Sequence, residues 1–564
     1  MRFYPKIFFP FVALTIFSTC GTTTDAKDYA PSVVTTTADA PFSKGVNLSG
    51  WFQYTGGPRG VSPNMFTADD FADIKRLGVD VVRLPLDLFA MTSGAPDYTL
   101  DPLFLKFLDQ AVDYAEESEI YLILDNHSSD GSNGETSDAV DEILIPIWTQ
   151  MAEHFKDRSD YVVYEVMNEP YGVSSERWGE IQGRVIEAIR AKDERRTIVV
   201  GGTSWNSIDE LAKLPVYEDD NLIYTFHFYD PFLFTHQGAS WASPSLANLK
   251  SVPFPANAGT LPNVPPDLKG SWVENSLKYD YTRASARETL TATIDKAVQF
   301  SIERGVAVFC GEFGVYMRNS NHADRVRWYE LVTKLLDERR IARTSWDYTG
   351  GFGLFKTESG RDVADLDVDV VQALDFTLPP QKPTAKIRAP FVLYDDSPSV
   401  NVSVTHWGGE TFDLYNKDAA EGDFAILWEN IPQYGNFSFG FTKPIDWLYL
   451  KDNGFVLEFK VKTSARGGFD VRFIDAETDD SVPWRMRFTV SEEQAPADSQ
   501  WHTIVIPLAD MQEHGAWINA TEQWRDPEEK FDWEKIDVLQ FAAENVGVQE
   551  SLHIDVIKIA ASGG

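Results

Sequence analysis

Two glutamates, each directly after an apolar segment, are the residues of this sequence best suited to do chemistry. Glu169 lies in Asn168-Glu169-Pro170, which follows the apolar segment Val162–Met167. Glu312 lies in Gly311-Glu312-Phe313-Gly314, which follows the apolar segment Val306–Phe309. Glycines on both sides of Glu312 leave room for a ligand to approach the backbone. Two facing carboxyl groups, one protonated near neutral pH and one ionised, are the minimal equipment for hydrolysis of a glycosidic bond.

Either motif alone also fits an ordinary strand end followed by a turn, so their pairing depends on the elements that position them. From Lys44 to about Phe355, short apolar segments alternate with amphipathic helical patterns. The eight segments expected to be strands are Lys44–Phe52, Val79–Leu86, Ile120–His127, Tyr161–Pro170, Thr197–Trp205, Leu222–Pro231, Ala307–Val315 and Arg343–Tyr348. The helical patterns include Ala68–Leu77, Pro102–Glu117, Glu176–Lys192, Arg287–Arg304 and Ala323–Arg339.

This alternation predicts an α/β fold, a closed (β/α)8 TIM barrel over residues 41–378. The alternative is an open doubly wound sheet, which usually has fewer strands and a phosphate-binding glycine turn. No G-x-G-x-x-G motif follows the first predicted strand. A long connection, Asp230–Asp280, is rich in Pro, Ser and Asn and would leave the sixth strand on the same rim as the glutamates.

Polar and aromatic residues end four other predicted strands, and in a barrel they would share one rim with the two glutamates. They are Arg83, His127, His227, Tyr229 and Trp346. Taken singly, each could be structural, as an ion pair, a half-buried histidine or a core aromatic. Their coincidence on one rim favours a catalytic site, because the barrel does not need polar groups there for stability. Glu165, by contrast, is expected to face the barrel interior as a paired structural acid.

The ordered set Arg83, His127, Asn168-Glu169, His227-x-Tyr229, Glu312 and Trp346 resembles glycoside hydrolase family 5, the retaining β-glycanases with catalytic glutamates on strands four and seven. The segment from Phe226 to Ala239 resembles the bacterial cellulase-type members. The resemblance implies that Glu169 is the general acid and then the general base. It also implies that Glu312 is the nucleophile that forms a glycosyl-enzyme intermediate.

The same resemblance assigns supporting roles to the other residues of the set. Arg83 and Tyr229 would hold Glu312 ionised, and Asn168 would bind the sugar 2-hydroxyl. His127 and His227 would position sugar hydroxyls and the acid. Trp346 would form the floor under the sugar at the cleavage site.

Three further tryptophans are candidates for sugar contacts, because pyranose rings present C–H faces that pack on flat aromatics. Trp51 and Trp205 end predicted strands one and five and could form neighbouring subsites, with core packing as the alternative. Trp241 lies in the long connection and could form a cleft wall.

A second domain is expected after a Pro-rich linker at residues 379–390. Residues 391–564 are predicted to form an all-β sandwich of jelly-roll type, with strands at Phe455–Lys462, Phe469–Asp475, Arg485–Val490, His502–Leu508 and Ile536–Phe541. The tryptophan content of this region loosely resembles a carbohydrate-binding module, which either binds glucan or merely buttresses the barrel. A structural calcium ion is a speculative addition there, with Asp555 as its candidate ligand. For catalysis we expect neither a cofactor nor a metal.

The first 20 residues predict an export signal, since Arg2 and Lys6 precede the apolar segment Ile7–Phe17, which is too short to span a membrane. Phe17-Ser18-Thr19-Cys20 resembles a lipoprotein cleavage box with Cys20 as the lipidated residue, and ordinary signal cleavage is the alternative. Residues 21–40 form a Thr-rich tether. We therefore expect an exported protein, a cell-surface or outer-membrane lipoprotein or else a secreted one, whose membrane contact is the lipid anchor alone.

The composition of the chain limits which classes of molecule it is expected to bind. The chain of 564 residues carries 50 basic and 86 acidic side chains, a net charge of −36, and offers no basic face for nucleic acid. An uncharged β-glucan fits such a surface, and we expect a monomer. Two cysteines, Cys20 and Cys310, give no expected disulfide in the mature fold. Cys310 is expected to point the same way as Glu312 but deeper, as a small core residue.

The sequence thus predicts a retaining, endo-acting glycoside hydrolase that cleaves β-1,4-glucan, either cellulose or mixed-linkage β-glucan. A β-1,3-glucanase or a β-mannanase on the same scaffold is the alternative. A metal-dependent hydrolase is a weaker rival, because the chain has no H-E-x-x-H motif and no cysteine cluster. A non-catalytic, surface-tethered glycan-binding lipoprotein is the alternative from another class.

Overall fold

The computed structural model describes residues 33–128, 135–256, 259–380, 386–399, 402–441, 445–475, 482–518, 521–544 and 548–562. The predicted export signal with Cys20, most of the Thr-rich tether and residues 381–385 of the predicted linker lie outside this set. Within the described residues, no helix combines the length and the apolar character that a membrane span requires.

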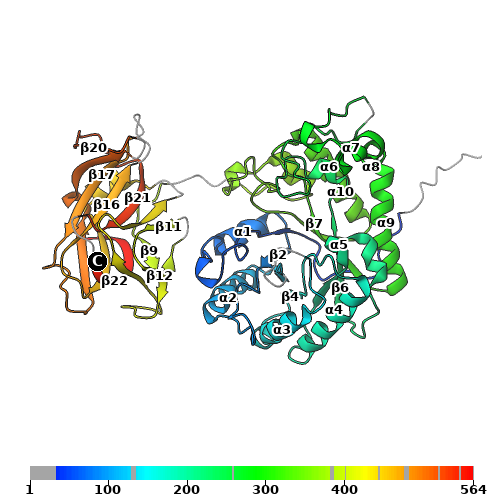
Figure 1. Ribbon diagram of the computed structural model, residues 1–564, viewed down its shortest axis with the longest axis horizontal. Helices are drawn as coiled ribbons and strands as arrows, with labels where there is room; N and C mark the ends of the chain where they lie inside the picture. Colours follow the sequence, from blue (N-terminus) through cyan, green and yellow to red (C-terminus); the bar gives the residue numbers. More distant parts are fainter. Residues whose placement is uncertain are drawn as a thin grey trace, which may run out of the picture. The chain divides into compact units, whose positions relative to one another are not determined.

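Eight parallel strands close into a barrel in chain order (Figure 1). They are β1 (Lys44–Asn47), β2 (Val81–Leu86), β3 (Tyr121–Asn126), β4 (Val162–Glu165), β5 (Ile198–Gly201), β6 (Leu222–Phe228), β7 (Ala307–Phe313) and β8 (Ala342–Ser345). β1 pairs with both β2 and β8, so the sheet has no free edge. The predicted closed barrel is confirmed, and the open-sheet alternative is wrong.

Helices connect the strands and cover the outside of the barrel. The longer ones are α1 (Ala68–Arg76), α2 (Pro102–Glu117), α3 (Asp141–Phe155), α4 (Ser175–Arg190), α9 (Arg287–Arg304) and α10 (His322–Glu338), and α11 (Val368–Ala373) follows β8. Side-chain caps begin some of them. Thr67 and Asp70 form a capping box on α1, and the side chain of Ser174 accepts from the backbone N–H of Arg177 on α4.

The β1–β2 connection adds a 3-10 turn, η1 (Pro58–Gly60), to α1, and two other connections depart further from a single regular helix. β5 leads into the short α5 (Thr203–Asn206) and a 3-10 helix, η2 (Ile208–Lys213). The long connection after β6 contains α6 (Phe232–Thr235), η3 (Pro266–Leu268), α7 (Trp272–Asn275), the π-helical turn η4 (Ser276–Asp280) and α8 (Tyr281–Ala284). As predicted, this connection leaves the C-terminal end of β6.

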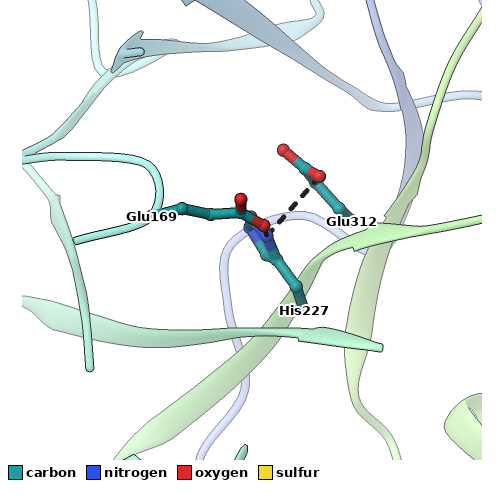
Figure 2. A group of neighbouring side chains, drawn as sticks. All are labelled: Glu169, His227 and Glu312. Carbon is teal, nitrogen blue, oxygen red and sulfur yellow. Dashed lines mark hydrogen bonds and ion pairs between the residues drawn. The ribbon is translucent and has the colours of Figure 1, made fainter. Parts of the chain in front are cut away.

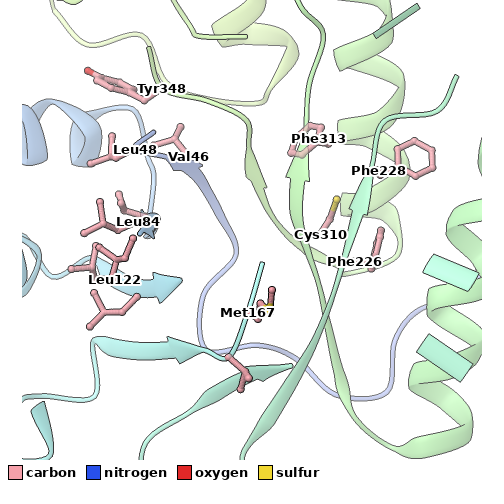
Figure 3. Packing of buried hydrophobic residues seen from close by; sticks show 14 of the residues in the cluster. Val46, Leu48, Leu84, Leu122, Met167, Phe226, Phe228, Cys310, Phe313 and Tyr348 are labelled. Atoms are coloured by element: carbon pink, nitrogen blue, oxygen red, sulfur yellow. The ribbon is translucent and has the colours of Figure 1, made fainter. Parts of the chain in front are cut away.

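Strand alternation separates two packed layers. Val81, Ile123, Val163, Val199, Ile223 and Phe309 share one apolar cluster inside the barrel. A second cluster lies between strands and helices and includes Leu84, Leu122, Phe226 and Phe228 (Figure 3). Two residues beyond the inner apolar layer, on the same inward face, the strands place Arg83, Asp125 and Glu165. The barrel floor is therefore apolar, and the next layer toward the C-terminal rim is charged.

A bulge in β7 aims Glu312 into the barrel. The β6–β7 register pairs Phe226 with Cys310 and His227 with Glu312, which leaves Gly311 as the extra residue. The carbonyl of Gly311 accepts from Asn47 Nδ2 at 3.1 Å and Thr344 Oγ1 at 2.6 Å. The expectation for Cys310 was wrong in direction: it does not lie under Glu312 but packs beside Phe226 in the strand–helix layer, fully buried (Figure 3).

The C-terminal region forms two antiparallel sheets, which confirms the predicted all-β fold. One contains β10, β9, β22, β13 and β12 in that order, with β15 and β18 joined through β22, and the other runs β11-β14-β21-β16-β17-β19-β20. The strands are β9 (Phe391–Asp395), β10 (Ser397–Pro398), β11 (Val402–Trp407), β12 (Thr411–Asn416), β13 (Ala425–Ile431), β14 (Asn436–Phe441), β15 (Phe455–Thr463), β16 (Phe469–Asp475), β17 (Trp484–Val490), β18 (His502–Pro507), β19 (Gln512–Ile518), β20 (Gln523–Arg525), β21 (Ile536–Ala542) and β22 (Val548–Ala561). Two short helices accompany them, α12 (Trp447–Asp452) and η6 (Leu508–Asp510). The five predicted strands correspond to β15, β16, β17, β18 and β21.

Asp555 acts as a loop anchor in this region. One of its carboxylate oxygens accepts from the backbone N–H groups of Ala420 and Glu421, and the other accepts from that of Val556. Three N–H donors make a poor environment for a cation, so nothing here supports Asp555 as a calcium ligand.

Candidate active site

Glu169, His227 and Glu312 converge at the C-terminal rim of the barrel (Figure 2). One carboxylate oxygen of each glutamate and a ring nitrogen of His227 all lie within 4.8 Å of one another. Glu312 belongs to β7, while Glu169 lies four residues past the end of β4. Residues 143 positions apart in the sequence therefore face one small space, which a single sugar ring could bridge.

Arg83 is the centre of the buried network beneath this space. Its guanidinium donates to both oxygens of Glu165, at 2.8 and 3.0 Å, and to Glu312 Oε1 at 2.8 Å. It also contacts Asp125 Oδ2 at 2.9 Å. Burial by itself would lower the pKa of Arg83, but these three carboxylates raise it well above its usual value. Arg83 therefore stays a fixed positive charge under the nucleophile candidate.

Glu312 is held on both of its oxygens. Besides Arg83 on Oε1, the hydroxyl of Tyr229 donates to Oε2 at 2.9 Å, and His227 Nδ1 lies 3.5 Å from Oε2. Burial, followed by the charges of Glu312 and Glu169, raises the pKa of Tyr229 well above its usual value, so its hydroxyl remains a donor. Donors on both oxygens fix the orientation of the Glu312 carboxyl group.

Glu169 has a different environment. Its Oε1 lies 2.6 Å from His227 Nδ1, and its side chain is 28% exposed. Burial of the carboxyl among its neighbours raises the pKa of Glu169 to about 7, although the charges of His127 and Arg83 lower it. Burial also lowers the pKa of His227 to about 4, so the imidazole is neutral. A carboxyl with this pKa can hold a proton near neutral pH and exchange it with solvent.

Asp125 and His127 orient Asn168. His127 Nδ1 bonds to Asp125 Oδ2 at 2.8 Å, which leaves Nε2 to accept from Asn168 Nδ2 at 3.1 Å. The Asn168 carbonyl accepts from Arg83 Nη2 at 2.7 Å. An amide carries two N–H donors, so the second hydrogen of Asn168 Nδ2 remains for a ligand. Burial lowers the pKa of His127 to about 4, which keeps this ring a neutral acceptor.

The candidate aromatic contacts divide into three that are accessible and one that is not. Trp346 is partly exposed and stacks on His127 with ring centroids 5.6 Å apart. Trp205 is 58% exposed and stacks on Tyr171, and Trp241 is 60% exposed with its edge contact on Tyr316. These three indoles offer surface to a ligand.

Trp51 offers no surface to a ligand, and its assignment to a sugar subsite is wrong. Its side chain is fully buried among Phe52, Phe66 and Phe71, and its indole N–H donates to the carbonyl of Ser62 at 3.0 Å. The chain turns after β1 and directs this ring into the core, so its position near a strand end did not determine where it points.

Sequence reasoning left three buried polar residues out of the site. Asp125 carries the His127 contact, and burial raises its pKa to about 7. Asn47 accepts from Arg83 at 3.0 Å and supports the Gly311 bulge. Asp347 follows Trp346 and accepts from Ser49 Oγ at 2.5 Å. A signal was available for the first two, since each is a polar residue within an apolar strand, in the phase that faces the barrel interior.

The three converging side chains also have the spacing of metal ligands, as do His322, Asp367 and Asp369. In the first group, however, Glu312 already bonds to the Arg83 guanidinium, and a second cation on that carboxylate would meet its positive charge. The arrangement therefore suits proton transfer and attack by a carboxylate better than metal binding.

Comparison with known proteins agrees with this geometry. Residues 39–351 match the family model "Cellulase (glycosyl hydrolase family 5)". Endoglucanase C of Acetivibrio thermocellus is 28% identical over 323 residues, covering 54% of this chain and 91% of that protein. Endoglucanase 3 of Fibrobacter succinogenes is 30% identical over 355 residues, and the match covers 58% of this chain and 52% of that protein.

Among solved structures, Thermotoga maritima Cel5A in complex with mannotriose is 24% identical, with a TM-score of 0.48, and the match covers 59% of this chain and 97% of that one. The family model alone spans more than half of the present chain. The chain belongs to glycosyl hydrolase family 5.

Proposed function

We propose that this glycoside hydrolase is a retaining, endo-acting β-glucanase that cleaves β-1,4-glucan through Glu169 and Glu312. The observation that carries the proposal is the pair of carboxyl groups within 4.8 Å in unlike surroundings. Retaining enzymes need a separation of about 5–5.5 Å between their carboxyl groups. The inverting mechanism needs a wider gap that admits a water molecule.

In the first step, a Glu312 oxygen attacks the anomeric carbon while the protonated Glu169 gives its proton to the departing glycosidic oxygen. The bond from the anomeric carbon to that oxygen breaks as the glycosyl–Glu312 ester forms. Arg83 stays bonded to Glu312 Oε1, so it holds the carboxylate in place while the carboxylate loses its charge to the new ester bond. The free N–H of Asn168 would bond the sugar 2-hydroxyl, and Trp346 would lie beneath the ring.

In the second step, Glu169 is a carboxylate and takes a proton from water, whose oxygen attacks the anomeric carbon and releases Glu312. A pKa near 7 suits a group that must act once as acid and once as base. His227 contacts both glutamates and, as a neutral imidazole, can donate to whichever carboxylate carries the charge at that stage.

The relatives support glucan as the first substrate, since those matched here are named endoglucanases and one is a cellodextrinase from Ruminococcus flavefaciens. β-Mannan is the second candidate on the same scaffold. A panel of carboxymethyl cellulose, mixed-linkage β-glucan, β-1,3-glucan and mannan, with product sizes and anomeric configuration by NMR, tests linkage, endo action and retention together.

Matched variants make that test specific to the mechanism. Glu312→Gln should abolish hydrolysis, and Glu169→Ala should slow it in a way that added azide rescues with a β-glycosyl azide product. Glu165→Gln, also a buried glutamate on Arg83 but away from the rim, provides the control for loss of a carboxylate. Hydrolysis by Glu312→Gln, or an inverted product from the wild type, would refute the proposal.

We propose further that no metal or other cofactor takes part, which activity after exhaustive dialysis against a chelator would support. Loss of activity restored by a divalent cation would instead favour the metal-dependent alternative.

We also propose that the chain is exported and lipidated at Cys20. Metabolic labelling with palmitate should label the wild type but not the Cys20→Ser variant. If the wild type is not labelled, the lipidation proposal is wrong and ordinary signal cleavage and secretion are favoured.

The sandwich is proposed to bind glycan rather than only to buttress the barrel. Its exposed tryptophans support this, because large indoles on a polar surface mark ligand contacts. This function would also suit the non-catalytic alternative, and only the hydrolysis panel separates the two.

A further inference from the structure

One face of the second sandwich sheet is polar although the sheet is wide and well packed. Phe437, Phe541, Val471 and Phe473 point into the sandwich core. Their neighbours along β14, β21, β16 and β17 therefore point to the other side. The register aligns Ser438, Gln540, Arg472 and Arg487 in one row across these four strands. We call this surface the polar sheet face; Figure 1 labels three of its strands, β16, β17 and β21.

Tryptophans lie at both edges of the polar sheet face. On the edge strand β11, Trp407 is 58% exposed and lies opposite Asn436 of β14. At the other edge, Trp517 of β19 and Trp524 of β20 are direct cross-strand partners and are 38% and 40% exposed. Seven strands about 4.8 Å apart separate the two edges by nearly 30 Å.

The floor between the tryptophans holds guanidinium nitrogens that have no acceptor in the part of the chain that the structure describes. Arg472 is 4% exposed and contacts Asp470, Gln540 and Glu544, yet its Nε is buried with no partner among the described residues. Arg485 Nε is in the same state. The Arg485 guanidinium lies 5.9 Å from the Trp524 ring, so the indole and an unmatched donor are adjacent.

His514 adds a third group of this kind. Its ring lies 5.0 Å from that of Trp524, and its Nδ1 is also buried without a partner among the described residues. Buried donors and acceptors without partners are costly and uncommon in native proteins. These groups and the exposed indoles share one face, so a ligand that offers both hydrogen-bonding atoms and flat C–H surfaces would suit it.

We propose that the polar sheet face is a second glycan-binding site, across which one polysaccharide chain lies with sugar rings on the edge tryptophans and oxygens on the Arg485 guanidinium. Sugars offer the two chemistries the face requires, C–H surfaces for indoles and oxygen acceptors for guanidinium groups. A strand-to-strand span near 30 Å fits a polymer rather than a monosaccharide. The choice of a glycan rests on the proposed function.

The test uses the full-length chain with Glu312→Gln, so that the polymer is not cut during the measurement. Affinity electrophoresis is run with hydroxyethyl cellulose, mixed-linkage β-glucan, galactomannan or a polyuronate in the gel. Two changes are made in this background, Trp407→Ala with Trp524→Ala, and separately Arg485→Gln. Tyr449→Ala is the matched control, since this ring is 38% exposed on α12.

We expect both site variants to lose about tenfold or more in affinity for at least one polymer, while the control migrates like its parent. Unchanged migration of both variants with every polymer would overturn the site, as would an equal loss in the control. Thermal unfolding checks each variant, and Arg485→Gln alone decides the matter if the double tryptophan variant does not fold. A loss of polyuronate binding alone, in Arg485→Gln, would identify an acidic glycan as the ligand.

Failure of this inference is distinguishable from failure of the proposed function. With Glu312 intact, the Trp407→Ala and Trp524→Ala chain should hydrolyse short cello-oligosaccharides within about twofold of the wild type, because no catalytic residue is changed. If the wild type cleaves no β-glycan, the proposed function fails, while the electrophoresis still decides whether the polar sheet face binds a polymer.

Discussion

Replacing Tyr229 by phenylalanine removes one hydrogen bond from the nucleophile candidate and almost nothing else. The hydroxyl donates to Glu312 Oε2 at 2.9 Å. The ring itself keeps its edge contacts with His236 and Phe352, whose centroids lie 4.9 and 6.2 Å away. No other hydrogen bond of the Tyr229 side chain is present among the described residues, so the variant should fold and keep its packing.

The size of the effect follows from the kind of bond. A hydrogen bond to a charged group contributes about 1.5–3 kcal/mol. If most of it serves to hold Glu312 in its attacking form and direction, kcat/KM should fall by about 10- to 150-fold. Glu312 would keep Arg83 on Oε1 but gain freedom at Oε2.

The assay is kcat/KM against pH on a chromogenic cello-oligosaccharide, with burst kinetics to separate glycosylation from deglycosylation. Tyr224→Phe is the matched control. It lies on the same strand, β6, but packs against Phe300 of α9 in the outer layer, with ring centroids 5.1 Å apart. A Tyr229→Phe enzyme within about twofold of the wild type would show that this hydrogen bond does not support the nucleophile.

Three other outcomes are expected. Because burial raises the pKa of Glu169 to about 7, kcat/KM should fall above that pH as the acid loses its proton; a flat profile to pH 9 would contradict this assignment. Arg83→Met should lower the free energy of unfolding in urea by about 3–5 kcal/mol, since it leaves buried carboxylates unpaired, and a loss below about 1 kcal/mol would count against the network. Burial also raises the pKa of Asp347 to about 7, so this group binds a proton more tightly folded than unfolded. Its contribution to the free energy of unfolding is therefore present in full below pH 4 and is lost as the pH rises to 7. Asp347→Asn should flatten the resulting fall in Tm between pH 4.5 and 7.5.

The barrel could be predicted because its signal is repeated eight times. Each strand is short, apolar and followed by an amphipathic segment, so an error at one strand would not have changed the fold. The convergence of Glu169 and Glu312 followed from the fold, since parallel strands place their C-terminal ends on one rim.

What the sequence did not disclose is the direction of individual side chains where the backbone is irregular. Trp51 sits in a turn after β1, where the alternation of the strand no longer applies. Cys310 precedes a bulge, and counting by twos through the bulge gives the wrong face. Neither irregularity leaves a local pattern, because both depend on contacts with other strands and helices.

In the C-terminal region, some of the strands that were missed are very short or irregular, whereas β14 alternates apolar and polar residues and could have been found. β12 and β13 contain register shifts, and β20 has only three residues. The pairing of Trp517 with Trp524 depends on the β19–β20 register, so the sequence could suggest exposed tryptophans but not which face they share.

Gly311 has no functional group, yet its small size leaves room for the His227 imidazole that lies between Glu169 and Glu312. A methyl group at this position would come within 2.8 Å of Thr225 Oγ1 and 3.3 Å of His227 Nε2. Even alanine would push against the imidazole that touches both glutamates. Attempts to alter the chemistry of this enzyme by evolution or design are thus constrained at a residue that no inventory of reactive side chains would include.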